Sequence, residues 1–209
     1  KEAVMGDFLD VVETEVPKAY ELLQKKAKEI GENLQHPKET LKRAREVWSL
    51  VKILKKEGMV DEGLAADMLM LALLDNFGIN TNILQKPGRL NLNEAKEITK
   101  HPQKGAELVQ RLGCSKEMAS WLETHHTRMD GKGYPSGTRP DSEKLQIYMA
   151  IRNLAAMINH RPYRVNGGLI PPSKAVNMLK EDQGFVPPII IEKYLEPIIR
   201  SYPEQTGNA

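Results

Sequence analysis

The chain has 209 residues, of which 40% are hydrophobic and 28% are charged, and its formal net charge at pH 7 is +2. This length is enough for one moderately large domain, or a domain with an appendage, to bury a core without disulfide bonds. The composition is that of a globular protein with no apolar run long enough for a membrane span, and the small charge gives no support for nucleic-acid binding.

The first segment of the chain predicts a helix. From Gly6 to Leu34, apolar residues recur every three or four positions, and Pro17 interrupts this pattern, so residues 1–36 form either one kinked helix or a helical hairpin. Two interpretations of the apolar stripe stay open: it packs on the chain's own core, or it forms the seam of a homodimer. Because the chain starts with Lys1 and has no secretory signal, we expect these residues to follow a missing upstream domain.

The remaining residues, 37–209, predict one all-helical domain, because no segment alternates apolar and polar residues as a half-buried strand does. Asp61 is placed to cap the most apolar helix, which we expect to lie at the centre. His101 precedes Pro102 and so marks a helix junction, where a side chain can point into a pocket. The single Cys114 excludes an intramolecular disulfide and fits a cytoplasmic location. The predicted helices span residues 37–56, 63–78, 91–101, 107–112, 115–124, 141–159, 172–181 and 188–201, with a linker at 167–172.

The most specific stretch of the sequence is His125–Pro135, which reads HHTRMDGKGYP. It begins with two adjacent histidines at the end of a predicted helix, and neutral imidazole is a common metal ligand. A turn follows, in which glycines permit positive φ and the proline restricts the residue before it, so that Tyr134 is held rigidly. For the two histidines alone, the alternative is a surface pair before an ordinary turn.

This stretch resembles the HH-E-x-x-D-G-x-G-Y-P signature of the HD-GYP family, metal-dependent phosphodiesterases that hydrolyse the bacterial second messenger cyclic di-GMP. Thr127 stands at the glutamate position, and every other fixed position matches. Three further segments follow the family's order: KPGRL at Lys86–Leu90, HPQKG at His101–Gly105 and RPYR at Arg161–Arg164. The resemblance covers roughly residues 65–164 and implies an HD-domain-like helical bundle, here with an N-terminal helical extension and two closing helices.

The resemblance also implies a set of metal-ligand positions, which in the family hold two cations a few ångströms apart and activate a water molecule. With Gly78 fixing the register, the family's H-D pair falls on Asp75 and Asn76, and the aspartate of its V-A-D segment falls on Arg152. An amide cannot bridge two cations as a carboxylate does, and a guanidinium repels the ion that this position should bind. Sliding the register by one makes Asp75 the bridging aspartate but leaves Arg152 unchanged. The positions that keep the family's ligands are His101, His125 and His126.

We therefore predict a catalytically inactive HD-GYP-type signalling module in cyclic di-GMP regulation. We expect either no cofactor or one transition-metal ion left on the three histidines, with Asp75 as a fourth ligand. The alternative is an active metal-dependent cyclic di-GMP phosphodiesterase with an unusual ligand set. For Arg152, on the inner face of a helix, we predict an ion pair with Asp75, since a charge buried without a partner costs several kcal/mol.

The resemblance implies two modes of action for such a module. In the first, the turn at residues 130–135 binds a diguanylate-cyclase (GGDEF) domain or another signalling protein. The residues that would make this contact are Asp130, Gly131, Gly133, Tyr134 and Pro135. In the second, the domain binds cyclic di-GMP, with arginines taking phosphate oxygens in pairs. The candidate residues for this second mode are Arg161, Arg164, Tyr134 and Lys86. Salt bridges within the protein and a packed tyrosine are the structural alternatives to these roles.

Overall fold

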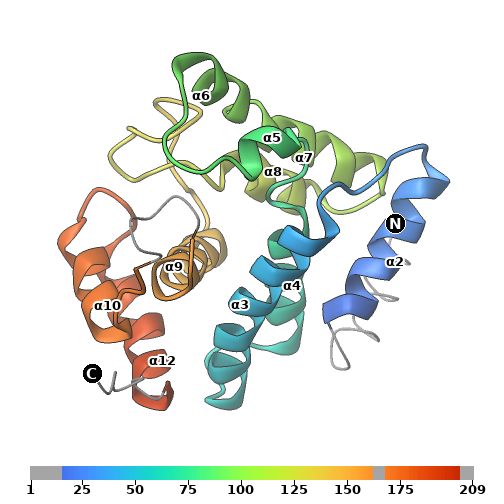
Figure 1. Ribbon diagram of the computed structural model, residues 1–209. Helices are drawn as coiled ribbons and strands as arrows, with labels where there is room; N and C mark the ends of the chain where they lie inside the picture. The colour runs from blue at the N-terminus through green and yellow to red at the C-terminus, as the bar shows by residue number, and fades with distance from the viewer. Residues whose placement is uncertain (1–15, 162–167, 203–209) are drawn as a thin grey trace.

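The structure, a computed structural model, describes residues 16–161 and 168–202. Every regular element within these two ranges is a helix, which confirms the predicted all-α fold. The helices form a bundle with α3 (Pro37–Lys56) and α4 (Glu62–Leu74) side by side in its middle (Figure 1). The first part of the predicted N-terminal stripe, residues 6–15, lies outside the described residues.

Local sequence signals explain how the two central helices begin. Pro37 occupies the first turn of α3. Backbone N–H groups in this turn have no acceptor within the helix, so proline, which lacks an N–H group, fits there at no cost in hydrogen bonds. Asp61 precedes α4, and its side chain accepts a hydrogen bond from the backbone N–H of Leu64 at 2.7 Å. From Ala65 to Leu74 every residue of α4 except Asp67 is buried, which confirms its predicted central position.

The N-terminal helix α2 (Val16–Glu29) packs against α3. Its inward residues Ala19, Leu23 and Ala27 are fully buried in the common core. The helix ends before Leu34, because Gly31 adopts a φ of 78° and turns the chain. The described part of the apolar stripe therefore packs on the chain's own core. A homodimer and a domain boundary after residue 36 stay predictions.

Four helices lie together at one end of the central pair and build the candidate site (Figure 1). The helices α7 (His101–Arg111) and α8 (Lys116–Thr124) pack closely against each other, and α8 also contacts α4. The sequence predicted the longest of the four only from residue 107, but it begins at His101 because Pro102 fits within a first helical turn. The four are α5 (Thr81–Leu84), which was not predicted, α6 (Leu92–Ile98), α7 (His101–Arg111) and α8 (Lys116–Thr124).

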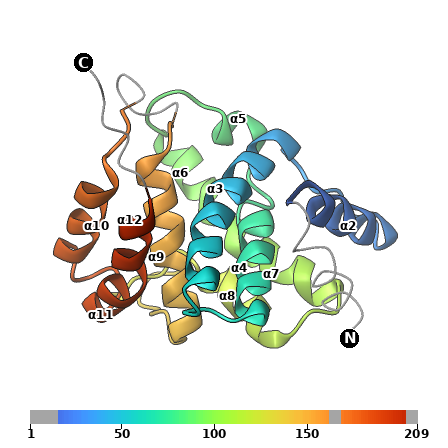
Figure 2. The same ribbon diagram turned by 90° about the horizontal axis from the view of Figure 1, so that it is seen from below.

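The long helix α9 (Glu143–Ile158) lies between α3 and the closing helices, as the second view shows (Figure 2). The two predicted closing helices are present, and the second is divided by a π-helical turn. Within the described ranges, no helix combines the length and the apolar character that a membrane span requires. The closing elements are α10 (Pro172–Glu181), α11 (Pro188–Ile190), the π-helix η2 (Ile191–Leu195) and α12 (Glu196–Ser201).

Candidate functional site

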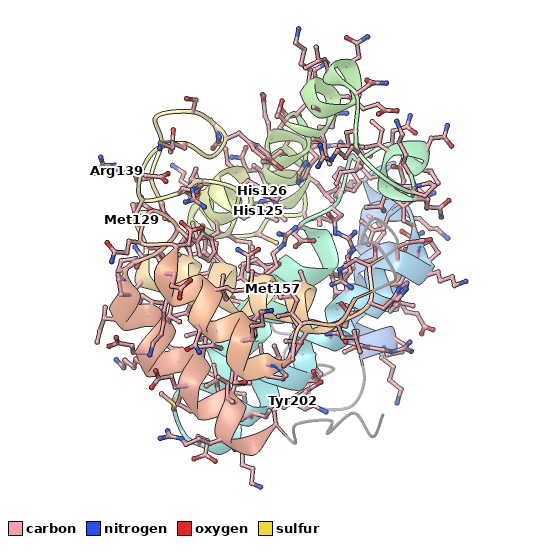
Figure 3. The ribbon with its side chains drawn as sticks, turned by 60° about the vertical axis from the view of Figure 1, so that its left-hand side comes forward. His125, His126, Met129, Arg139, Met157 and Tyr202 are labelled. Carbon is pink, nitrogen blue, oxygen red and sulfur yellow. The ribbon has the colours of Figure 1, made fainter. Side chains whose placement is uncertain are left out.

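Three histidines converge where α7 meets the end of α8. His101 is the first residue of α7, His125 follows the last residue of α8, and His126 comes next. The ligand nitrogens of the three side chains lie within 4.8 Å of one another, and His101 and His125 are buried. In Figure 3, His125 and His126 lie inward of the loop that carries Met129 and Arg139. The adjacent histidines are thus part of an interior site rather than a surface pair.

Hydrogen bonds to the backbone fix which nitrogen of each buried imidazole carries the proton. Nδ1 of His101 contacts the carbonyl of Ile98, and Nδ1 of His125 contacts the carbonyl of Leu122 at 2.6 Å. Because a carbonyl only accepts, each Nδ1 carries the hydrogen and each Nε2 keeps its lone pair. The two Nε2 atoms face each other at 3.3 Å. Burial, reinforced by the charge of Arg152, lowers the pKa of His125 to about 3, so its ring is neutral near pH 7.

A buried ion pair forms the wall beside the histidines. Asp75 follows the last residue of α4. Its Oδ2 atom accepts a hydrogen bond from Nε of Arg152 at 2.5 Å and another from the hydroxyl of Tyr148 at 2.8 Å. The predicted pairing of Arg152 with Asp75 is confirmed. Burial alone would raise the pKa of Asp75, but the Arg152 guanidinium and these hydrogen bonds hold it below its usual value.

A cleft of about 490 Å³ opens beside these groups, between the histidines and the segment that contains α5. His101, His126 and Arg152 line its inner side. The α5 segment and the end of α6 contribute apolar side chains, among them Ile83, Leu84 and Ile98. Among the described residues that line the cleft, four are cationic and none carries a carboxylate, so the cleft suits a ligand that combines negative charge with an apolar surface. The four are Arg43, Lys86, Arg89 and Arg152.

The tyrosine of the His125–Pro135 stretch faces this cleft. Its ring stacks on His126 with a centroid distance of 4.5 Å, and its backbone N–H donates to the His126 carbonyl at 3.0 Å. Gly133 makes this approach possible, because a Cβ atom there would lie 2.2 Å from the same carbonyl oxygen. Tyr134 is therefore placed to contact a ligand. Among the other loop residues, Asp130 and Pro135 are exposed.

The model of the HD domain family matches residues 22–185 of the chain. The chain belongs to this family. A 3'3'-cGAMP-specific phosphodiesterase of Vibrio cholerae is 29% identical over 111 residues, which are 52% of this chain and 24% of the relative. A cyclic di-GMP phosphodiesterase of Pseudomonas aeruginosa is 26% identical over 160 residues, which are 73% of this chain and 37% of the relative. This HD domain thus spans well under half the length of these relatives.

The fold of this HD domain is also found in a solved structure. An HDG"Y"P protein from Bdellovibrio bacteriovorus aligns with a TM-score of 0.57 over 95% of this chain and 70% of the other, at 17% sequence identity. At this identity the match concerns the fold alone. Together with the ordered motifs, these similarities confirm the resemblance to the HD-GYP family.

Among the described residues, only one half of the two-metal centre that the resemblance implies finds fitting ligands. The three histidines offer neutral nitrogen ligands at compatible distances, and a transition-metal ion bound there would lower the pKa of a bound water. At the other half, Arg152 itself brings a positive charge to the carboxylate of Asp75. Asn76 supplies a neutral amide whose oxygen accepts from Arg43 at 3.3 Å. A second metal ion does not fit this donor set.

Asp75 stands apart from the histidine cluster in its present contacts. Its carboxylate is not among the groups whose ligand atoms lie within 4.8 Å of one another. Its Oδ1 atom is buried and accepts no hydrogen bond from the described residues. The proposed role of Asp75 as a fourth metal ligand stays a prediction.

Of the two arginines predicted to bind phosphate, Arg161 lies within the described residues. Arg161 forms a bidentate ion pair with Glu46, at 3.1 and 2.6 Å, and both side chains are nearly buried. Its guanidinium thus already has the carboxylate partner that a phosphate would replace, and it does not line the cleft beside the histidines. Arg164 lies outside the described residues. Lys86 lines the cleft and pairs with Glu94 at 2.6 Å.

The loop after His126 is held against the segment that joins α10 to α11, by contacts that the sequence did not indicate. Arg128 binds both carboxylate oxygens of Asp182, at 2.9 and 2.6 Å. The backbone N–H groups of Met129 and Asp130 donate to the carbonyls of Phe185 and Gly184, each at 3.0 Å. Residues 128–130 and 182–185 are far apart in sequence and share no local pattern, so only the folded structure brings them together.

Proposed function

We propose that this HD domain is a signalling module that binds a 3'3'-cyclic dinucleotide in the cleft beside its histidines and does not hydrolyse it by a two-metal mechanism. The observation that carries the proposal is the ion pair of Arg152 with Asp75. It puts a guanidinium beside the histidine cluster, where a hydrolytic centre of this family needs a second metal ion.

The ligand class is supported by two independent features. The relatives are named as phosphodiesterases of cyclic di-GMP or of 3'3'-cGAMP. Among the described residues that line the cleft, four are cationic and can bind phosphates. The apolar side chains and the ring of Tyr134 can contact nucleobases. A volume of about 490 Å³ lies within the usual range of small-molecule sites.

The direct test is a hydrolysis assay with cyclic di-GMP and 3'3'-cGAMP, in the presence of added manganese or iron. We expect no turnover above the rate without protein, because the donor set at Asp75, Asn76 and Arg152 cannot hold the second cation. The same samples, examined by calorimetric titration, are expected to bind at least one of the two nucleotides. Metal-stimulated turnover that disappears in His125→Ala would instead establish the alternative, an active enzyme with an unusual ligand set.

A second candidate function is recognition of a protein partner, and the firm attachment of the loop favours it. The loop is held by Arg128 and by two backbone hydrogen bonds, while Lys132 and Pro135 are exposed. A fixed, exposed loop can contact a partner with little loss of conformational entropy.

The partner proposal is tested by titrating the domain with a diguanylate-cyclase (GGDEF) domain. Lys132→Ala with Pro135→Ser should weaken association by about tenfold, as loss of a small contact set does. Tyr134→Ala should have a smaller effect on this association, because the ring faces the cleft. Equal affinities of the loop variant and the unchanged domain would remove the loop as the interface.

A further inference from the structure

Arg152 lies where two cavities approach each other. It lines the cleft beside the histidines and also a smaller cavity of about 160 Å³ that is bordered by Glu46, Asp75 and Arg161. Its side chain is 19% exposed, whereas that of Asp75 is only 5% exposed. The carboxylate is thus enclosed, and the arginine is the member of the pair that a ligand in the cleft can reach.

The contacts of Arg152 fix the direction of its guanidinium. Nε donates to Oδ2 of Asp75, and the hydroxyl of Tyr148 donates to the same oxygen, so the acceptor is held from two sides. Since Nε is engaged by Asp75, a ligand in the cleft can use the Nη groups at the far end of the planar fork. A guanidinium remains charged at any accessible pH and matches the geometry of two phosphate oxygens.

We propose that Arg152 is a phosphate-binding residue of this domain, and that its guanidinium, held by Asp75, replaces a metal ion in ligand binding. This inference rests on the proposed function, because it assigns the contact that the cyclic dinucleotide makes. It goes further in stating that binding does not require any metal ion. A second guanidinium, that of Arg43, lies in the same cleft and is placed by its contact with Asn76.

Charge supports this assignment over binding through the histidines alone. The backbone hydrogen bonds of His101 and His125 leave a lone pair on each Nε2 atom, and a lone pair does not attract an anionic phosphate. A cyclic dinucleotide carries two phosphodiester groups, each with one negative charge. Among the described residues that line the cleft, the cationic groups that can attract these charges without a metal ion are the four side chains of arginine and lysine. Two of them, Lys86 and Arg152, already have the carboxylate partners Glu94 and Asp75, so Arg152 would bind a phosphate while it remains paired with Asp75.

The experiment is a calorimetric titration of the domain with cyclic di-GMP and with 3'3'-cGAMP, after dialysis against EDTA and repeated with added manganese. The main variant carries Asp75→Asn and Arg152→Gln together, which removes both charges and leaves neither buried alone. Arg152→Lys is the second variant, because it keeps the charge and loses the fork. Arg139→Gln is the matched control, since Arg139 is exposed on the loop outside the cleft.

We expect the unchanged domain to bind with the same affinity in EDTA as in manganese. The double variant should bind at least about tenfold more weakly, as expected for the loss of charge-assisted hydrogen bonds. The affinity of Arg152→Lys should lie between those of the unchanged domain and the double variant, and the affinity of Arg139→Gln should equal that of the unchanged domain. Circular dichroism of each variant checks that it is folded.

Different failures have different meanings in this experiment. Binding that requires manganese, or that is equally strong in the folded double variant and in the unchanged domain, would overturn the role of Arg152 while leaving the proposed function in place. Absence of binding in both EDTA and manganese would overturn the proposed function, and the role of Arg152 with it.

Discussion

Replacing Arg152 by alanine should lower the free energy of unfolding by roughly 3–5 kcal/mol, the usual cost of leaving one charge of a buried pair without its partner. Asp75 is 4% exposed and would keep only the hydroxyl of Tyr148 as a donor to its carboxylate. In a chain of this size such a loss lowers the thermal midpoint by about 6–20 °C. Thermal and urea unfolding, followed by circular dichroism, measure the change.

A double-mutant cycle separates the ion pair from ordinary packing. Asp75→Ala with Arg152→Ala should recover part of the loss, because no unpaired buried charge remains. Arg111→Ala is the matched control: its ion pair with Glu32 is much more exposed, and we expect a cost below about 1 kcal/mol. Strictly additive effects of the two single changes would show that Arg152 and Asp75 do not stabilise each other.

The stabilisation that the Arg152–Asp75 pair contributes should depend on pH, and its sign follows from the pKa shift of Asp75. The pKa of Asp75 is lower in the folded domain than in the unfolded chain. Between the folded and the unfolded pKa of Asp75, the native state therefore binds fewer protons than the unfolded chain. The stabilisation is present above the unfolded pKa of about 3.9 and is lost as the pH falls through the folded pKa. The difference between Arg152→Ala and the unchanged domain should be largest near pH 7 and should shrink below about pH 4.

Local signals in the sequence were enough to predict much of the fold and one contact of the site. Pro37 and Asp61 predicted where two central helices begin, because capping and first-turn preferences act within a few residues. The pairing of Arg152 with Asp75 was also predictable, since a guanidinium on an apolar helix face needs a carboxylate and an apolar helix ends in one.

Other contacts of the site could not be predicted, because they depend on how distant segments meet. The ion pair of Arg161 with Glu46 joins residues 115 positions apart. From the sequence, Arg161 was instead a candidate for binding phosphate. The inward stacking of Tyr134 on His126 depends on the path of the loop rather than on any periodic pattern. Periodicity identifies the buried face of a helix, but it does not identify which side chain lies opposite.

Restoring the family's residues at the three changed metal-ligand positions should give this domain a second metal ion. The changes are Asp75→His, Asn76→Asp and Arg152→Asp, which remove the guanidinium and supply an imidazole and two carboxylates beside the three histidines. After incubation with manganese or iron and gel filtration, elemental analysis should find an increase from at most about one ion per chain to about two, and hydrolysis of cyclic di-GMP should become measurable.

The controls for this gain depend on charge. Arg152→Asp alone places a second carboxylate near buried Asp75, so without metal it should be less stable than the triple variant with metal, because like charges in a buried site repel. Adding His125→Ala to the triple variant should reduce the metal content again, since that imidazole is one of three converging ligands. If the triple variant is folded but binds no more metal than the unchanged domain, then the Arg152 guanidinium is not what keeps the second ion out, and a difference in backbone position must exclude it.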